Sequence, residues 1–468
     1  MKRTPALAVL GLFVLLASFL LSAPANAQGD SAKNFNENKA QFMVPLGDLI
    51  AEMEKDAQVK ITYSDAVKPY LEEKVVMAPW KFWDDPKLRL AYMLAPLDLS
   101  FEQVDEKTFQ IIVPKYHVRP ESEAKAHLDR LLRQYSNREL WEKRVETLRS
   151  TIAEKFNLDP IPRDVLNPRL GEKRTYDGYT VRNVALEILP GYFMNGSLYE
   201  PLTDGKHPAV LCPHGHGEMG RFGEDQQIRS AVLARMGAVV FTYSMFAWRE
   251  EESPLLHVDH NDQISGPIQT LQTIRAIDWL VTLPNVDPEK IGITGASGGG
   301  TQTFVGTAMD PRITVAVPVV MPSAHFFGGC PCESGVPFHV LNGLTCNIEI
   351  AAMAAPRPMK LIAVTQDWTK NTPEVEFPYM QKIYGYYGAE QNVEYAILDE
   401  PHNYKEGKRR EMYPFMAKHL GLSMDQCDES KVTVEPLETL LYWGPNHENY
   451  PADAVQTLDD LKKVFYKK

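Results

Sequence analysis

The stretch Lys290-Ile-Gly-Ile-Thr-Gly-Ala-Ser-Gly-Gly-Gly300 decides the fold of this chain. It places Ser297 inside a Gly-x-Ser-x-Gly pattern, directly after a short β-branched run and directly before a segment typical of a helix. A strand-to-helix turn that lifts a serine hydroxyl off a sheet crowds the neighbouring Cα positions, which therefore tolerate almost no side chain. The stretch predicts a nucleophile elbow with Ser297 at its tip.

Strands and helices are expected to alternate on both sides of this elbow. Apolar, β-branched runs predict the strands, and amphipathic segments between them predict the helices. The expected strands are 181–189, 192–199, 207–212, 238–243, 290–294, 313–320, 359–364 and 393–398, and the expected helices are 227–236, 267–283, 299–309, 374–387 and 407–420. This order implies a mostly parallel, doubly wound sheet with helices on both faces. Together with the elbow it predicts an α/β-hydrolase fold.

A serine nucleophile needs a base, and the base needs a carboxylate that orients it. In this fold the carboxylate and the histidine follow the serine in that order along the chain. Asp367 and His402 each lie just past an expected strand, at the sheet edge that carries the elbow. We therefore predict Ser297, His402 and Asp367 as catalytic residues. Glu333, in the loop after the preceding strand, is the alternative acid, and the sequence leaves the choice between the two carboxylates open.

Acyl transfer also needs hydrogen-bond donors for the oxyanion of the tetrahedral intermediate. The residue after the nucleophile, Gly298, offers one backbone amide. The loop Pro213-His-Gly-His-Gly217 offers a second, which we assign to His216, while His214 is expected to bond the loop backbone as scaffold. Aromatic and cationic residues in neighbouring loops are candidates for contact with substrate. The predicted substrate-binding residues are Trp248, Arg249 and Trp368.

Four residues invite comparison with a zinc site: His325, Cys330, Cys332 and His339. Their spacing is not that of a known compact site, and Cys-x-Cys is weaker than paired Cys-x-x-Cys. The sequence therefore predicts no metal and no cofactor. The five cysteines of the chain allow at most two disulfides, and two cysteines one residue apart rarely bridge each other.

The beginning of the chain is typical of an exported protein. Lys2 and Arg3 precede an apolar run that ends in Ala25-Asn-Ala27, which predicts a secretory signal peptide over residues 1–27 and a periplasmic or secreted protein. A retained anchor is the alternative interpretation of the apolar run. No later segment predicts a membrane span, and a formal charge of −12 disfavours a nucleic-acid partner.

The expected domain organisation has four parts after the signal peptide. Residues 38–116 form a small α+β domain, and 117–165 a charged helical connector. Residues 166–424 form the catalytic domain, and a C-terminal tail, 425–468, packs on it. The first part resembles the secretin and TonB short N-terminal (STN) domain through Val44-Pro-Leu-Gly-Asp-Leu-Ile-Ala-Glu-Met and Val59-Lys-Ile-Thr-Tyr-Ser. That resemblance implies a periplasmic protein partner.

Several motifs of the long domain together resemble the acetyl xylan esterase-like α/β-hydrolases. They include Leu211-Cys-Pro-His-Gly-His-Gly217, Ser323-Ala-His-Phe-Phe-Gly-Gly-Cys-Pro-Cys-Glu333 and Gln366-Asp-Trp-Thr-Lys-Asn-Thr-Pro373, besides the elbow. The resemblance covers residues 167–422. It implies an exported serine esterase with Ser297, Asp367 and His402 as its triad and no cofactor. The loop after Tyr243 departs from many relatives, so acetyl specificity does not transfer with the motifs.

The sequence thus predicts a serine carboxylic-ester hydrolase that removes acetyl or methyl esters from polysaccharide. The substrate class is an ester-bearing carbohydrate. Two other functions are alternatives. A serine peptidase of the prolyl oligopeptidase kind uses a similar elbow but carries a large propeller, of which no bladed repeat is visible before Val181. A noncatalytic periplasmic binding or signalling protein would act through the STN-like domain.

Overall fold

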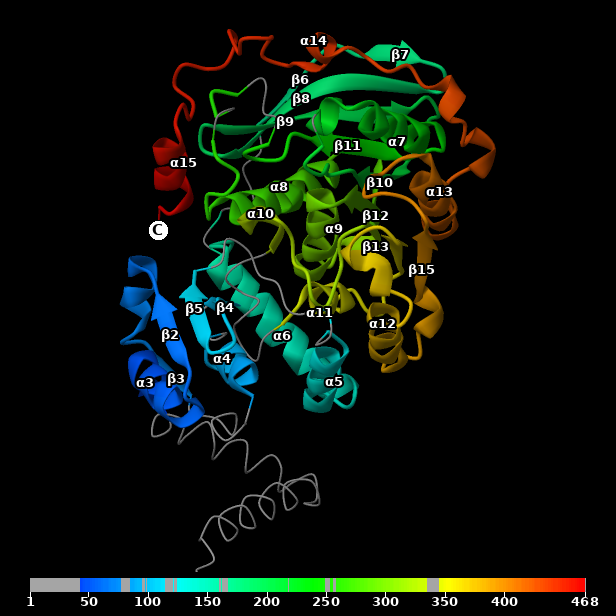
Figure 1. Cartoon of the computed structure of the whole chain (residues 1–468). Helices are drawn as coiled ribbons and strands as arrows, with labels where there is room; N and C mark the ends of the chain where they lie inside the picture. The colour runs from blue at the N-terminus through cyan, green and yellow to red at the C-terminus, as the bar shows by residue number, and fades with distance from the viewer. Residues whose placement is uncertain are drawn as a thin grey trace, which may run out of the picture. The chain divides into compact units, whose positions relative to one another are not determined.

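The computed structural model of the chain is shown in Figure 1. It describes residues 43–76, 85–94, 97, 99–113, 121, 124–159, 161, 167–217, 219–248, 253–255, 258–334 and 345–467. The chain divides into two compact units, Met1–Pro114 and Lys115–Lys468. The predicted signal peptide, and with it the alternative of a retained anchor, lies outside the described residues.

The first unit is a small α+β domain. Its elements are β1 (Met43–Pro45), α3 (Leu46–Ala57), β2 (Lys60–Tyr63), η2 (Asp65–Tyr70), β3 (Lys74–Val76), α4 (Pro86–Leu94), β4 (Ser100–Gln103) and β5 (Thr108–Ile112). β5 pairs in parallel with β2 and antiparallel with β4, while β1 pairs with β3. Both helices bury apolar residues at helical spacing, including Leu46, Leu49, Ile50 and Met53 of α3, and this gives the unit a core of its own.

The second unit is built on one sheet of ten strands. Its strand order is β15-β14-β13-β12-β10-β11-β9-β8-β6, with β7 paired to β8. The strands from β10 to β15 run parallel to one another, and β9, β8 and β6 add an antiparallel edge. This arrangement confirms the predicted α/β-hydrolase fold. In Figure 1 the strands extend from β6, β8 and β9 at the top of the unit to β15 at its right.

From β10 onwards, at least one helix separates each strand of this sheet from the next along the chain. The strands are β6 (Asn167–Leu170), β7 (Arg174–Tyr176), β8 (Tyr179–Leu189), β9 (Tyr192–Pro201), β10 (His207–Leu211), β11 (Val239–Tyr243), β12 (Val286–Ala296), β13 (Ile313–Val319), β14 (Met359–Val364) and β15 (Val393–Leu398). The main helices are α7 (Glu224–Arg235), α8 (Ser265–Leu280), α9 (Gly298–Met309), α10 (Pro331–Ser334), α11 (Asn347–Ala352), α12 (Glu376–Gly385) and α13 (Glu406–Leu420).

The two faces of the sheet carry separate apolar cores, as the alternation of side chains along a strand requires. Ala209 and Leu211 of β10 pack on the side of α8, α9, α11 and α12, whereas Val210 between them packs on the side of α7 and α13. Val239 and Phe241 of β11 face the first side in the same way, and Val240 the second. Burial on both faces explains why these strands are continuous apolar runs in the sequence.

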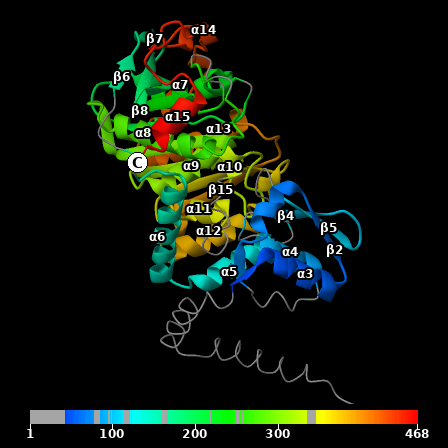
Figure 2. The same cartoon turned by 90° about the vertical axis from the view of Figure 1, so that its left-hand side faces the viewer.

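The charged connector forms two helices rather than one continuous helix. α5 (Ala124–Gln134) ends before Asn137, whose side chain accepts the amide of Leu140 and caps α6 (Arg138–Lys155). Figure 2 shows α6 on the same side of the sheet as α9, α11 and α12. Arg144 of α6 binds both carboxylate oxygens of Glu349 on α11, at 2.8 and 2.9 Å.

The C-terminal tail runs back over the sheet and contributes to its core. Trp443 packs on Phe193 with a ring-centroid distance of 5.4 Å and donates its Nε1–H to Asn195 at 2.8 Å. The last helix, α15 (Leu458–Phe465), places Leu461 and Phe465 in the larger core. A short helix, α14 (Leu437–Leu440), precedes Trp443 in the tail.

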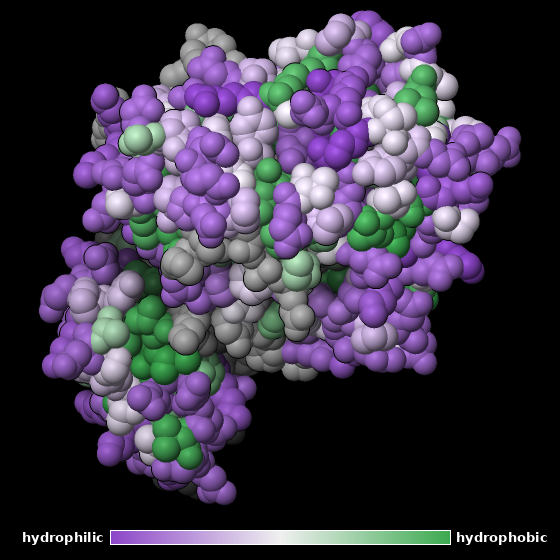
Figure 3. Space-filling model, turned by 90° about the horizontal axis from the view of Figure 1, so that it is seen from above, coloured by the Kyte–Doolittle hydropathy of each residue, from purple (hydrophilic) through white to green (hydrophobic). Residues whose placement is uncertain are grey.

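Hydrophilic residues cover most of the surface seen in Figure 3, and apolar residues occur there in small separate groups. Such a distribution is ordinary for a folded domain surrounded by water. In the part of the chain that the structure describes, no helix is long and apolar enough to cross a membrane.

Candidate active site

Ser297 sits at the tip of a strand-to-helix elbow. β12 ends at Ala296 and α9 begins at Gly298, and Ser297 between them has φ 56° and ψ −122°. A positive φ is strained for a residue with a Cβ, and such strain marks functional turns of this kind. The Ser297 amide donates to Val319 of the neighbouring strand at 3.1 Å, which holds the turn against the sheet.

Close approach of backbone explains the glycines on either side. A Cβ built on Gly295 would lie 2.5 Å from the Pro213 carbonyl oxygen and 2.6 Å from backbone atoms of Gly299. A Cβ on Gly299 would collide with the same Pro213 oxygen and approach the His214 carbonyl to 2.9 Å. Because these neighbours are backbone atoms, they cannot turn aside. The predicted reason for the Gly-x-Ser-x-Gly pattern is therefore met in the structure.

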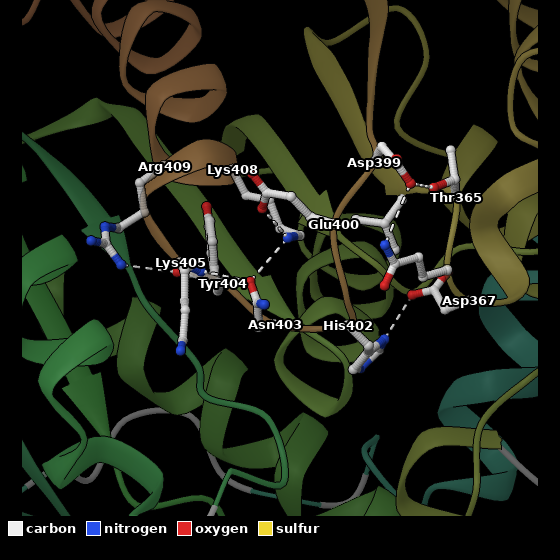
Figure 4. A network of polar contacts seen from close by, with 12 residues as sticks. Thr365, Asp367, Asp399, Glu400, His402, Asn403, Tyr404, Lys405, Lys408 and Arg409 are labelled. Carbon is white, nitrogen blue, oxygen red and sulfur yellow. Dashed lines mark hydrogen bonds and ion pairs between the residues drawn. The ribbon is translucent and has the colours of Figure 1, made fainter.

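His402 lies against Asp367 at the same sheet edge. His402 follows β15 and Asp367 follows β14, and the His402 Nδ1 is 2.7 Å from Asp367 Oδ2 (Figure 4). The other carboxylate oxygen of Asp367 accepts the Thr369 amide at 2.6 Å and the Thr369 hydroxyl at 2.5 Å. An imidazole that donates its Nδ1–H to a carboxylate keeps Nε2 as the basic nitrogen. No hydrogen bond joins His402 to Glu333 among the described residues.

A buried lysine fixes the loop that carries His402. The Lys408 side chain is 0% exposed, and its Nζ donates to Glu400 at 2.7 Å and to Asn403 at 2.9 Å. These two residues flank His402, so Lys408 ties both ends of the loop to α13, as Figure 4 shows. Positioning of this kind restricts the loop to the geometry that a proton-transfer group requires.

Glu333 lies between the nucleophile and His216 instead. The Ser297 hydroxyl donates to Glu333 Oε1 at 2.9 Å, and His216 Nδ1 is 3.0 Å from the same oxygen. The second oxygen of Glu333 accepts the Gly329 amide at 2.9 Å. Burial by itself would raise the pKa of the Glu333 carboxyl, but these donors and the charge of His216 lower it below its ordinary value. For His216, burial by itself would lower the pKa of the imidazole, but its contacts with Cys330 and Glu333 raise that pKa above its ordinary value.

The loop from Pro213 to Gly217 supplies the other predicted groups. His214 is buried: its Nδ1 is 2.8 Å from the Gly215 carbonyl oxygen and its Nε2 accepts the Met245 amide at 3.0 Å, so it is scaffold as predicted. Burial lowers the pKa of His214 to about 3, which keeps its imidazole neutral. Among the described residues, the backbone amides of Gly298 and His216 have no protein acceptor. Their assignment to the oxyanion stays a prediction.

The predicted substrate-binding residues have different surroundings. Trp248 donates its Nε1–H to the Gly217 carbonyl at 3.0 Å and lies 4.5 Å from the His216 ring. Trp368 lies 4.7 Å from the His402 ring and donates to the Met321 carbonyl at 3.2 Å. Both tryptophans therefore flank histidines of the site. Arg249 lies outside the described residues.

The sequence did not predict that cysteines would meet His216. Cys332 Sγ is 3.2 Å from His216 Nε2, and Cys330 Sγ is 2.7 Å from Cys332 Sγ. His260 joins them from the loop before α8, 5.2 Å from the His216 ring. His325, which the sequence grouped with these cysteines, instead lies beside Ser323. His339 lies outside the described residues. His260 could not be predicted as part of the site, because nothing in its local sequence points to it.

Comparison with known proteins places this geometry in a family. A search against family models found no match. The structure of methylesterase BT1017 is 34% identical in sequence, with a TM-score of 0.72, over 91% of this chain and 98% of that one. The chain belongs to the family of methylesterase BT1017. Because the second unit alone is smaller than 91% of the chain, the match also includes part of the N-terminal unit.

More distant relatives match a smaller share of the chain. Acetyl esterase Axe7A of Xylanibacter ruminicola is 26% identical over 163 residues, which are 31% of this chain and 36% of that protein. The chain spans 36% and 48% of the lengths of the two curated relatives it matches. A glucuronoyl esterase from Teredinibacter turnerae, 14% identical with a TM-score of 0.50, covers 69% of this chain and 97% of its own and shows the shared fold alone.

Proposed function

We propose that this protein is a serine carboxylic-ester hydrolase that acts on ester-bearing carbohydrate. Ser297 is the nucleophile, His402 the general base and then the general acid, and Asp367 the carboxylate that orients His402. The observation that carries the proposal is the 2.7 Å contact between His402 Nδ1 and Asp367 Oδ2 at the sheet edge where Ser297 stands at positive φ.

The charge state of Glu333 favours His402 as the base. A carboxylate whose pKa is held below its ordinary value is a weak base, so Glu333 accepts the Ser297 hydrogen bond without taking the proton. The hydroxyl of Ser297 must therefore turn from Glu333 towards His402 Nε2 when substrate arrives. Catalytic hydrogen bonds often form only in the complex with substrate.

The reaction proceeds through an acyl-enzyme. Ser297 Oγ bonds to the ester carbonyl carbon while its proton passes to His402 Nε2, and the carbonyl oxygen becomes an oxyanion held by the amides of Gly298 and His216. The carbon–oxygen bond to the leaving alcohol then breaks, and His402 returns the proton to that alcohol. Water repeats the sequence on the acyl-enzyme and releases the carboxylate.

Methyl esters are the first substrate class to test, and acetyl esters the second. The relative that matches nearly the full chain is named a methylesterase, whereas the named acetyl esterase matches about a third of this chain. With a methyl-esterified acidic sugar, the sugar carboxyl forms the acyl-enzyme and methanol leaves. Trp248 and Trp368, beside His216 and His402, and Arg249 are proposed to contact the sugar.

The decisive experiment measures methanol and acetate released from methyl-esterified pectin and acetylated xylan. The mature chain should release one product at least about a thousandfold faster than Ser297→Ala, because the substitution removes the nucleophile. Ser150→Ala, on the exposed face of α6, is the matched control and should keep full activity. Equal release by Ser297→Ala and the parent chain would exclude this mechanism, while activity on 4-nitrophenyl acetate alone would leave both carbohydrate classes unsupported.

We infer that the N-terminal unit is an STN-like docking module and that the mature protein begins after Ala27 in the periplasm or outside the cell. The order of helices and strands in residues 43–113 is compatible with the STN resemblance. Cross-linking of the full chain in its host should join a periplasmic protein to this unit, and N-terminal sequencing of the exported protein should start at Gln28. A retained Met1 or cross-links only to the catalytic unit would count against this inference.

A further inference from the structure

Four possible ligands of a soft metal ion converge beside the nucleophile. One ring nitrogen each of His216 and His260 and the Cys330 sulfur all lie within 4.8 Å of one another. Cys332 Sγ adds a fourth atom, 3.2 Å from His216 Nε2 and 2.7 Å from Cys330 Sγ. They come from three loops at the same sheet edge: those after β10, β11 and β13.

Two of the separations, those between His216 Nε2 and the cysteine sulfurs, are close to those that a tetrahedral zinc ion imposes. Zinc binds sulfur at about 2.3 Å and imidazole nitrogen at about 2.0–2.1 Å, so neighbouring ligand atoms stand about 3.3–3.8 Å apart. The Cys330 sulfur is 3.9 Å from His216 Nε2, and the Cys332 sulfur is 3.2 Å from it. The two sulfurs, at 2.7 Å, have to separate, and the His260 nitrogen, within 4.8 Å of the His216 nitrogen and the Cys330 sulfur, has to move closer to complete a tetrahedron.

The surroundings orient His216 as a metal ligand. Its Nδ1 faces the buried Glu333 carboxylate at 3.0 Å, which leaves Nε2 turned to the two sulfurs. A histidine that donates one nitrogen to a carboxylate and offers the other to the ion is the usual outer arrangement of zinc sites. Asp259 Oδ1 lies 3.8 Å from Nδ1 of His260, a separation longer than a hydrogen bond. The orientation of His216 is an observation independent of the distances among the ligands.

Solvent reaches this cluster of ligands, and an aromatic ring covers one side of it. The cysteines are buried, whereas the His216 and His260 side chains are 20% and 28% exposed, which gives an ion a way in. The Trp248 ring packs on both histidines, at 4.5 and 4.9 Å. Two thiolates neutralise the charge of a divalent ion, and thiolate with imidazole selects zinc over calcium or magnesium.

We propose that His216, His260, Cys330 and Cys332 bind one zinc ion. The ion joins the loop that carries the His216 amide to the loop that carries Glu333, and so fixes two groups that adjoin Ser297. This departs from the metal-free enzyme that the sequence predicts. The proposal concerns binding and stands whether or not the ester hydrolase assignment is correct.

The test is titration of the full chain, purified with reductant that is then removed, with zinc chloride and separately with cobalt chloride. One zinc should bind per chain, and cobalt should give the intense absorption of a tetrahedral thiolate site. His260→Ala and Cys330→Ser should each weaken zinc binding at least about tenfold, since each removes a ligand. Cys427→Ser, a half-buried cysteine of the tail, is the matched control and should bind as the parent chain does.

At the same zinc concentration, zinc should raise the thermal unfolding midpoint of the parent chain and of Cys427→Ser by more than that of Cys330→Ser. Circular dichroism of each variant without metal establishes that it is folded. Zinc binding that is equal in Cys330→Ser and the control would overturn the proposal. A Cys330–Cys332 disulfide that re-forms in the presence of zinc and abolishes the cobalt spectrum would also overturn the proposal. It would be detected as a mass lower by two hydrogen atoms.

Discussion

Replacing Asp367 by Asn tests the assignment of the orienting acid with almost no change of shape. Asp367 Oδ1 accepts the Thr369 amide at 2.6 Å, and a backbone N–H can only donate. The Asn oxygen therefore has to stay on that side, and its NH2 group has to face His402 Nδ1. A donor opposite Nδ1 forces the proton of the neutral imidazole onto Nε2, where it can no longer accept the Ser297 proton.

The expected loss of kcat is about 10³–10⁴-fold, or roughly 4–5.5 kcal/mol of transition-state stabilisation. Substrate binding should change little, because Asp367 is 4% exposed and does not reach the surface of the site. The assay is the steady-state rate of methanol or 4-nitrophenol release, with the thermal midpoint measured in parallel to show that the variant is folded. Asp399→Asn, an exposed carboxylate in the same loop network, is the control and should stay within about twofold of the parent rate.

A loss below about tenfold in Asp367→Asn would refute this reasoning. If Glu333→Gln then lost activity by the larger factor, Glu333 would be the acid that orients the base, and His402 would have to move from Asp367 to reach it. If both variants kept their activity, the base would be another residue altogether.

Three further predictions concern the scaffold. Gly295→Ala should lower the free energy of unfolding by about 1–3 kcal/mol through backbone collision, measured by urea denaturation, whereas Gly217→Ala, with open space at its Cβ, should not. Arg144→Met should cost about 3–5 kcal/mol in the same assay, since it strands a carboxylate of zero exposure, and a change below 1 kcal/mol would be inconsistent with a buried ion pair. Burial raises the pKa of the Glu376 carboxyl to about 7, so between about pH 4.5 and pH 7 the folded state holds a proton that the unfolded state has released. The free energy of unfolding should therefore fall by up to about 3 kcal/mol as the pH rises through this range. The thermal midpoint measured over this pH range should show the loss of stability in the parent chain and in the exposed variant Glu374→Gln, but not in Glu376→Gln.

Much of the fold could be predicted because its signals are local. The helices predicted at 299–309 and 407–420 and the strands predicted at 359–364 and 393–398 lie within one residue of α9, α13, β14 and β15. The elbow was predictable for the same reason, since the backbone collisions that require Gly295 and Gly299 leave a mark in consecutive residues. The order of serine, acid and histidine followed from the fold.

What the sequence missed depends on contacts between distant segments. β6 pairs with β8 at the edge of the sheet, and all four residues of β6 are exposed. Its sequence therefore lacks the apolar alternation that predicts a strand. Glu333 was considered as the partner of His402, but the structure places it against Ser297 and His216. The contacts of Glu333 depend on which loops meet in the folded chain, and the spacing of residues in one sequence does not predict this. The meeting of Cys332 with His216, 116 positions apart, is hidden for the same reason.

The ionic contact between α6 and α11 sets a limit on how this protein can be cut or recombined. Tyr135 adds a 2.8 Å hydrogen bond to the pair that Arg144 forms with Glu349. Two residues that precede the expected boundary at residue 166 therefore satisfy one carboxylate in the helical layer of the hydrolase sheet. A fragment starting at 166 would expose apolar residues of α9 and leave that charge unmatched, so it should aggregate. The smallest independently expressible enzyme should begin before Ala124, and grafting another N-terminal module onto this hydrolase should succeed only if the graft keeps both connector helices.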